Sequence, residues 1–245
     1  MARPVRALNY YGSKVQSAHR YPAPNTSLIV EPFCGGAGYS LHYGRGTGSA
    51  RRDVLLFDLN PEVIGAWQYL IATPGAEILR LPLLKVGESA PASLEPGARL
   101  LIGWSNMMCG AHTQSVLVPS ATRVPGSFWG ESKRAALARL ADEIKHWRAF
   151  VAPYWDLPSD VSATWFIDPP YQGRAGKHYV HNSSSIDYGH LAAWVQSRPG
   201  QVIVCEGPDA TWLPFVEHHK HASAPTADVV GRRVSTEMIW TRGCP

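Results

Sequence analysis

The sequence has few cysteines and no long apolar run, and both absences narrow the classes of protein it can belong to. Cys34, Cys109, Cys205 and Cys244 are far apart and form no C-x-x-C pair, so neither a zinc ribbon nor a disulfide framework is indicated. No segment approaches the roughly 18 apolar residues that span a bilayer, and the first residues hold no apolar signal core. We therefore expect a soluble cytoplasmic protein with no membrane partner and no metal.

The chain also lacks a strong excess of either charge. Lys and Arg total 23 against 19 Asp and Glu, a net charge of +4, which permits a polyanionic partner but excludes a histone-like binder. Charged residues are only 17% and apolar residues 45% of the 245 residues, so a large core can form. With 22 Gly and 20 Pro, the chain has too many breaks for a helical bundle or a coiled coil.

Short apolar runs in the first third predict a nucleotide-binding α/β unit. Residues 27–31 form a buried strand, and the glycines at 35, 36 and 38 form a turn after it. Residues 54–57 form a second strand. A helix should follow to about residue 70, with Asn60 as its N-cap and Pro61 in its first turn. Strand, glycine turn, helix, strand and acidic residue is the order of such a unit.

The middle of the chain reads differently from its two ends. Prolines interrupt it often, and its one long periodic segment predicts a helix over 131–148. After the middle segment, predicted strands and helices alternate again. The strands are at 164–167, 201–205 and 236–241, and the helices are at 188–196 and 210–218. We predict one Rossmann-like α/β sheet with helices on both faces, formed by residues 1–73 and 151–245, and a small insertion at 74–150.

Asp168-Pro169-Pro170-Tyr171 directly follows a predicted buried strand. The carboxyl ends of parallel strands are where α/β proteins bind ligands. The prolines stiffen the loop and remove two backbone donors, which leaves carbonyl acceptors beside a carboxylate and a flat ring. That set suits a planar base with an exocyclic NH2 group. Taken alone, the motif is also compatible with an ordinary proline turn.

Four motifs in order carry a resemblance to a known family. They are Asn9-Tyr-Tyr-Gly-Ser-Lys14, Glu31-Pro-Phe-Cys-Gly-Gly-Ala-Gly38, Asp58-Leu-Asn60 and the D-P-P-Y motif. Together they resemble the S-adenosylmethionine-dependent DNA adenine methylase (Dam-like) family, which methylates adenine N6. The resemblance covers the first 70 residues well and the segment after Tyr154 moderately, and it fades in between. It implies that the sheet is a methyltransferase sheet and that the insertion recognises the target.

The resemblance also implies roles for single residues. Asp58 would accept hydrogen bonds from the ribose hydroxyls of S-adenosyl-L-methionine, Lys14 would face its carboxylate, and Asp156 would lie near its adenine amine. The family's last motif glycine falls on Ala37, a small departure. The residues implied to bind the cofactor are Tyr10, Tyr11, Gly12, Lys14, Glu31, Pro32, Phe33, Cys34, Gly35, Gly36, Asp58, Leu59, Asn60 and Asp156.

For catalysis, the resemblance implies Asp168, Pro169, Pro170 and Tyr171. Asp168 and the Pro169 carbonyl would accept hydrogen bonds from the amine of a flipped adenine, with Tyr171 stacked on the base. Basic side chains would contact double-stranded DNA: Arg123, Lys133, Arg134, Arg174 and Lys177. We expect a monomer from a prokaryotic cell, encoded by that cell, a virus or a mobile element.

Two alternative functions stay open, whereas one apparent metal site is set aside. The same motifs fit N4-cytosine or RNA base methylation, because D-P-P-Y can bind any planar amine. A non-catalytic DNA-binding protein that retains the fold is the other alternative. His218, His219 and His221 have no suitably spaced carboxylate or cysteine partner, so we expect a solvent-facing helix end there.

Overall fold

The computed structural model describes residues 5–45, 51–106, 113, 116–117, 126–173, 175–222 and 234–244. Within these ranges, no helix is both long enough and apolar enough to cross a membrane. The strands are β1 (Leu28–Glu31), β2 (Asp53–Asp58), β3 (Arg148–Val151), β4 (Ala163–Ile167), β5 (Gly200–Glu206), β6 (Val216–Ala222) and β7 (Val234–Arg242). The α-helices are α1 (Gly38–Tyr43), α2 (Pro61–Ala72), α3 (Gly75–Ile78), α4 (Pro96–Asn106), α5 (Glu131–Glu143) and α6 (Tyr188–Ser197).

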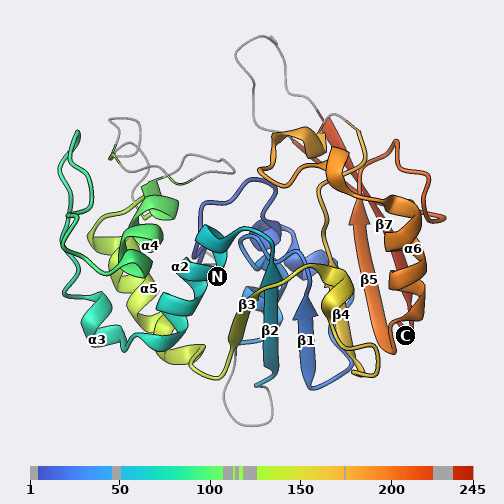
Figure 1. Cartoon of the computed structure of the whole chain (residues 1–245), viewed down its shortest axis with the longest axis horizontal. Coiled ribbons are helices and arrows are strands. Elements are labelled where there is room, and N and C mark those ends of the chain that lie inside the picture. Colours follow the sequence, from blue (N-terminus) through green and yellow to red (C-terminus); the bar gives the residue numbers. More distant parts are fainter. Residues whose placement is uncertain are drawn as a thin grey trace.

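The strands form one sheet in the order β3-β2-β1-β4-β5-β7-β6. The first five are parallel, and β7 runs antiparallel between β5 and β6. Strand order reverses between β1 and β4, the switch point of a doubly wound sheet, where ligands bind beyond the carboxyl ends of the strands. These ends lie at the top of Figure 1.

Alternating strand residues build a core on each face of this sheet. Ile29 and Phe166 pack in one cluster with residues of α1 and α2, whereas Val30 and Trp165 pack in the other with residues of α6. Both faces therefore carry helices (Figure 1). The predicted fold class, a Rossmann-like α/β sheet with helices on both faces, is confirmed.

Local signals placed most elements correctly. The Asn60 side chain accepts a hydrogen bond from the Glu62 amide at 2.9 Å, so it caps α2 as predicted. The helix predicted over 131–148 ends earlier, at Glu143, because the chain enters β3 at Arg148. Three residues of the predicted insertion therefore belong to the sheet, and the division at 150–151 falls inside β3.

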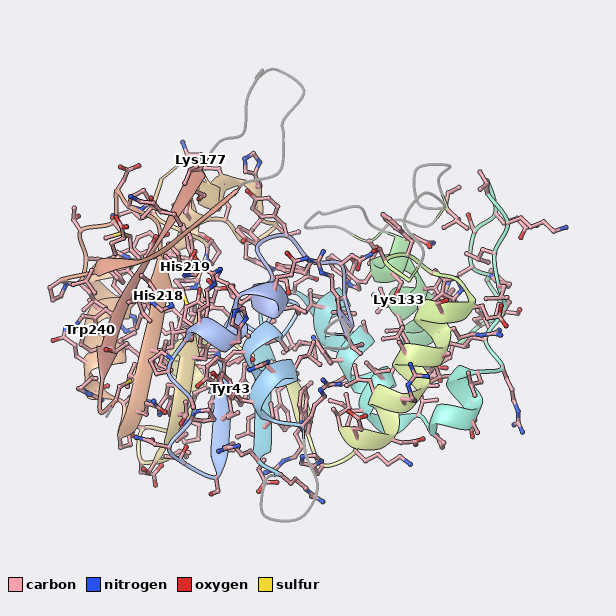
Figure 2. The ribbon with its side chains drawn as sticks, turned by 180° about the vertical axis from the view of Figure 1, so that it is seen from behind. Tyr43, Lys133, Lys177, His218, His219 and Trp240 are labelled. Carbon is pink, nitrogen blue, oxygen red and sulfur yellow. The ribbon has the colours of Figure 1, made fainter. Side chains whose placement is uncertain are left out.

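The helix predicted over 210–218 is wrong. That segment enters β6, which pairs with β7 along an antiparallel register from Val216 to Ala222. Pairing with β7 overrides the weak local helical preference. His218 therefore lies in a strand and packs on the Tyr21 ring, with the ring centroids 4.8 Å apart, so the predicted helix end is also wrong (Figure 2).

Helices of the predicted insertion share the main core and do not form a separate one. Helix α4 packs on α2, and α5 packs on α2 and α3. Trp104 of α4 and Trp67 of α2 are both fully buried in the same cluster. The Asn9 side chain donates to the Ser105 carbonyl at 3.1 Å and the Ser127 carbonyl at 2.8 Å, which fastens the N-terminal segment to this region.

The predicted DNA contact of Lys133 is wrong. Lys133 lies on α5 (Figure 2), is only 3% exposed, and donates to the Arg6 carbonyl and the Asn9 side chain. Its helical face packs inward, so its ammonium cannot reach a phosphate. Arg134 is half-buried and donates to the Leu81 carbonyl at 2.5 Å, and its DNA contact stays a prediction. Arg123 lies outside the described residues.

Burial of Lys133 should make stability depend on pH. Burial lowers its pKa from near 10.5 to about 7, so between these values the unfolded chain binds a proton that the folded chain does not. Stability should therefore rise with pH across this window, by up to about 1.4 kcal/mol per pH unit.

Chemical denaturation of wild type and Lys133→Met at several pH values measures this dependence. The stability of wild type relative to the variant should rise from pH 7 to pH 10. Lys145→Met, at an exposed position after α5, is the control. If the difference in free energy of unfolding between wild type and Lys133→Met does not change from pH 7 to pH 10, the inference is contradicted.

Candidate active site

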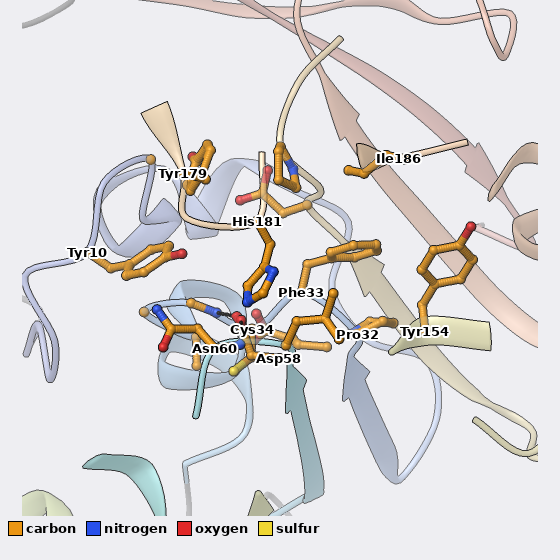
Figure 3. Close-up of a pocket in the computed structure, with 18 of the residues that line it drawn as sticks. Tyr10, Pro32, Phe33, Cys34, Asp58, Asn60, Tyr154, Tyr179, His181 and Ile186 are labelled. Atoms are coloured by element: carbon orange, nitrogen blue, oxygen red, sulfur yellow. Dashed lines mark hydrogen bonds between the residues drawn. The ribbon is translucent and has the colours of Figure 1, made fainter. Parts of the chain in front are cut away.

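A cavity of about 470 Å³ opens at the switch point, above the carboxyl ends of β1, β2 and β4. In Figure 3, Tyr10 and Tyr179 lie at one end and Tyr154 at the other, with Asp58 at the bottom. The cavity brings together most of the residues that the resemblance implies to bind the cofactor. Their role in binding stays a prediction. Those lining it are Tyr10, Tyr11, Gly12, Lys14, Glu31, Pro32, Phe33, Cys34, Gly35, Gly36, Asp58, Leu59 and Asn60.

The glycine turn after β1 has no room for larger side chains. Gly35 has φ +42°, and a Cβ there would lie 2.7 Å from the Tyr10 ring. A Cβ on Gly38 would lie 2.5 Å from the backbone nitrogen of Val15. Ala37, at the family's last glycine position, has φ +45°, a left-handed conformation that costs an L-residue roughly 1–2 kcal/mol. The backbone therefore keeps the glycine conformation where the sequence has alanine.

Asp58 is held at the end of β2 by backbone amides on both sides. One oxygen accepts from the Gly35 amide at 3.0 Å and the other from the Asn60 amide at 2.9 Å. Burial raises its pKa, and these two hydrogen bonds partly offset the rise. The carboxylate is thus fixed between the glycine turn and α2, with acceptor capacity left over.

Two buried polar atoms at the cavity wall have no hydrogen-bond partner among the described residues. They are the hydroxyl oxygen of Ser13 and the side-chain nitrogen of Asn60. Buried polar groups are almost always paired, so these two call for a polar partner inside the cavity. A ribose or an amino acid moiety would supply one, and the donor set therefore fits S-adenosyl-L-methionine.

Lys14 lines the cavity, but its ammonium is bound to Asp168 and not held free for a cofactor carboxylate. The nitrogen lies 2.7 and 2.8 Å from the two carboxylate oxygens of Asp168 and 3.6 Å from Glu237. A buried ammonium needs an anionic partner, and these carboxylates supply it. Asp168, Cys205 and Glu237 each place a ligand atom within 4.8 Å of the others, and Lys14 supplies the cation beside them.

The D-P-P-Y loop turns its tyrosine away from the cavity. The Tyr171 hydroxyl donates to Glu237 at 2.5 Å, and its ring centroid lies 5.0 Å from the Lys14 ammonium. Of the motif, Asp168 and Pro170 line the cavity, whereas Pro169 and Tyr171 do not. The predicted stacking of Tyr171 on a base is therefore not met, because its hydroxyl is bound to β7.

Glu206, at the end of β5, shapes the loop after this motif. Its carboxylate accepts from the Gln172 amide at 2.8 Å and from the Trp212 indole at 3.0 Å. Glu31, at the end of β1, accepts from the Ser40 amide at 2.7 Å. Burial raises the pKa of Glu31 to about 8. Burial also raises the pKa of Glu206. Four strand ends thus present an acidic side chain, including Asp58 and Asp168.

The predicted cofactor contact of Asp156 is not supported. Its side chain is exposed and does not line the cavity, whereas Tyr154 and Trp155 of the same turn do. The turn is a 3-10 helix, whose three residues point in three different directions. Asp187, the N-cap of α6, and His190, bound to the Tyr154 hydroxyl at 2.8 Å, line this end instead.

Sequence reasoning missed further residues of this site. His181 and Asp187 have no motif to mark them, although an aspartate before a predicted helix is a capping signal. Glu237 could have been found, because a charged residue on the buried side of an alternating strand is unusual. Lys177 is exposed at the carboxyl-end side of the sheet (Figure 2), and its DNA contact stays a prediction. Arg174 lies outside the described residues.

Comparison with known proteins yields little. No protein-family model and no curated protein matches the chain. Two solved structures of the rRNA methyltransferase aviRa from Streptomyces viridochromogenes are similar to it at 14% identity. One has a TM-score of 0.37, covering 91% of this chain and 80% of that one. The other has a TM-score of 0.36, covering 93% and 90%. The fold assignment therefore stands on the sheet topology, and the site must be judged on its own geometry.

Proposed function

We propose that this protein is an S-adenosyl-L-methionine-dependent methyltransferase that methylates the N6 amine of adenine in double-stranded DNA, acting as a monomer. One observation carries the proposal. A single cavity at the switch point joins Asp58, the glycine turn and Asp168, three features that lie far apart in the sequence. The order of the four motifs supports adenine in DNA as the substrate.

The proposed cofactor position follows from the cavity wall. Asp58 would accept from the ribose hydroxyls, and the glycine turn lets the ligand approach the backbone. The Phe33 and Tyr154 rings, with centroids 5.5 Å apart, would form one aromatic surface for the adenine, with Asp187 nearby. When bound, S-adenosyl-L-methionine supplies an electrophilic methyl group.

Asp168 would activate the substrate amine. The lone pair of an adenine amine is delocalised into the ring, so hydrogen bonds from NH2 to the carboxylate favour a tetrahedral nitrogen whose lone pair can attack. The bound cofactor would supply the methyl group to this lone pair, and its sulfur would keep the electron pair of the broken carbon–sulfur bond. The nitrogen, now positive, then loses one N–H proton. Acceptors fixed in advance need no reorganisation as charge develops.

The substrate base must leave the duplex to reach Asp168 inside the cavity. Aromatic rings at one end of the cavity offer flat surfaces for it. The Tyr10 and Tyr179 ring centroids lie 5.9 Å apart (Figure 3). The Tyr11 ring, which also lines the cavity, lies 5.6 Å from that of Tyr179. These rings would take the stacking role that Tyr171 does not fill.

Transfer of labelled methyl groups to DNA and to RNA, followed by digestion and mass analysis of the nucleosides, tests the proposal. We expect N6-methyladenine in DNA. N4-methylcytosine or a methylated RNA base would replace the proposed substrate. No transfer to any nucleic acid, with the cofactor bound, would favour a non-catalytic binding protein.

Asp168→Asn should abolish most activity. The variant keeps the shape of the side chain but loses the charge that faces the amine, so kcat should fall about 100-fold or more. Cofactor affinity, measured by calorimetry, should stay close to wild type. Asp209→Asn, on an exposed turn after β5, is the control. Full activity of Asp168→Asn would remove Asp168 from the mechanism.

Asp58→Ala should instead weaken cofactor binding. Loss of charge-assisted hydrogen bonds to the ribose should raise Kd about tenfold or more, or ~1.4 kcal/mol. Asp53→Ala, at the opposite end of β2, is the matched control because it is exposed and far from the cavity. Calorimetry measures both, and an unchanged Kd for Asp58→Ala would exclude Asp58 from the ribose site.

A further inference from the structure

Beneath the cavity, one buried ammonium is shared by two carboxylates. Lys14 is 8% exposed and Glu237 is 4% exposed. The Lys14 nitrogen donates to both oxygens of Asp168 and to the Gly12 carbonyl at 3.3 Å. Among the described residues, its next anionic neighbour is Glu237, at 3.6 Å. The three charges therefore sum to one net negative charge when all are ionised.

Glu237 reaches this cluster from β7 without touching the cavity. One of its oxygens accepts from the Tyr171 hydroxyl at 2.5 Å and from the Tyr21 hydroxyl at 2.8 Å. It does not line the cavity, so it can act on a ligand only through its neighbours. Those neighbours are the D-P-P-Y tyrosine and the lysine that holds Asp168.

The contact between Lys14 and Asp168 constrains the proposed reaction. A substrate amine must donate to carboxylate oxygens that already accept from Lys14, so the amine and the ammonium must share the acceptor positions of Asp168. If Lys14 gives way, its buried ammonium needs another anion. Glu237 is already within ion-pair distance, so a small movement of the lysine side chain keeps the ammonium paired.

We propose that Glu237 is a positioning residue: it shares the Lys14 ammonium with Asp168 and fixes the Tyr171 hydroxyl, so that Asp168 can turn to the substrate amine. The inference rests on the proposed function. The negative charge of Glu237 also offsets the positive charge of Lys14, which makes Asp168 a stronger base. After methyl transfer, a carboxylate oxygen of Asp168 binds the leaving N–H proton, the N–H electron pair returns to nitrogen, and the proton then passes to solvent.

The pKa directions agree with this arrangement. Burial raises the pKa of Asp168, Lys14 lowers it, and Glu237 raises it again. Lys14 and the two tyrosine hydroxyls hold the pKa of Glu237 below its usual value against the effect of burial. Among the described residues, the titratable groups that interact with the two carboxylates are Tyr10, Lys14, Tyr21, Glu31, Tyr171, Cys205, Glu206, His218 and His219.

Glu237→Gln separates charge from hydrogen bonding, because its amide oxygen can still accept from both tyrosines. The apparent pKa of Asp168, measured by carbon-13 NMR of the aspartate carboxyl groups, should fall by about one unit or more. The acidic limb of the kcat profile should move to lower pH by a similar amount. Glu217→Gln, an exposed glutamate on β6, should shift neither. Glu237→Asp keeps the charge and should restore the wild-type limb.

The NMR titration needs no methyl transfer, so it separates two failures. If wild type methylates no nucleic acid, the proposed function fails while the carboxyl titration still tests the link between Glu237 and Asp168. An Asp168 pKa that is unchanged in Glu237→Gln would overturn the inference. If that variant does not fold, the carboxyl titration of wild type tests the inference. Glu237 must stay ionised over the pH range in which Asp168 gains its proton. Protonation of Glu237 before Asp168 as the pH falls would overturn the inference.

Discussion

The pairing of Lys14 with Asp168 connects parts of the chain that lie 154 residues apart. It joins the N-terminal segment to the end of β4 and, through Glu237, to β7. Buried charges are costly unless they are paired, so this contact requires the N-terminal segment to lie where it does. The close approach of Gly38 to the backbone at Val15 and the fastening by Asn9 serve the same placement.

The glycine turn is fixed from both sides of the site. Trp67 of α2 donates to the Gly35 carbonyl at 2.9 Å, and Asp58 accepts from the Gly35 amide. Helix α2 in turn packs on α4 and α5, so the helices of the inserted segment support the floor of the cavity. The segment expected to recognise a target therefore also supports the part of the chain that forms the cavity.

Much of the fold could be predicted, because buried parallel strands are apolar runs and α2 carries a clear cap at Asn60. The cavity walls followed from the motifs. What failed depends on contacts outside the local segment: β6 becomes a strand only by pairing with β7, and Lys133 is buried by the N-terminal segment. The partner of Lys14 could not be predicted from the sequence either, because no local pattern distinguishes a lysine that faces a ligand from one that faces Asp168.

The row of acidic side chains at the strand ends couples the cavity to protons. Burial raises the pKa of Glu31, Asp58, Asp168 and Glu206 alike. A cation entering beside them favours their ionised forms, so its binding is linked to proton release and tightens as pH rises. The same edge disfavours phosphate. Glu31, Asp58 and Asp168, the members of this row that line the cavity, would therefore favour a positive or neutral group beside them over a phosphate.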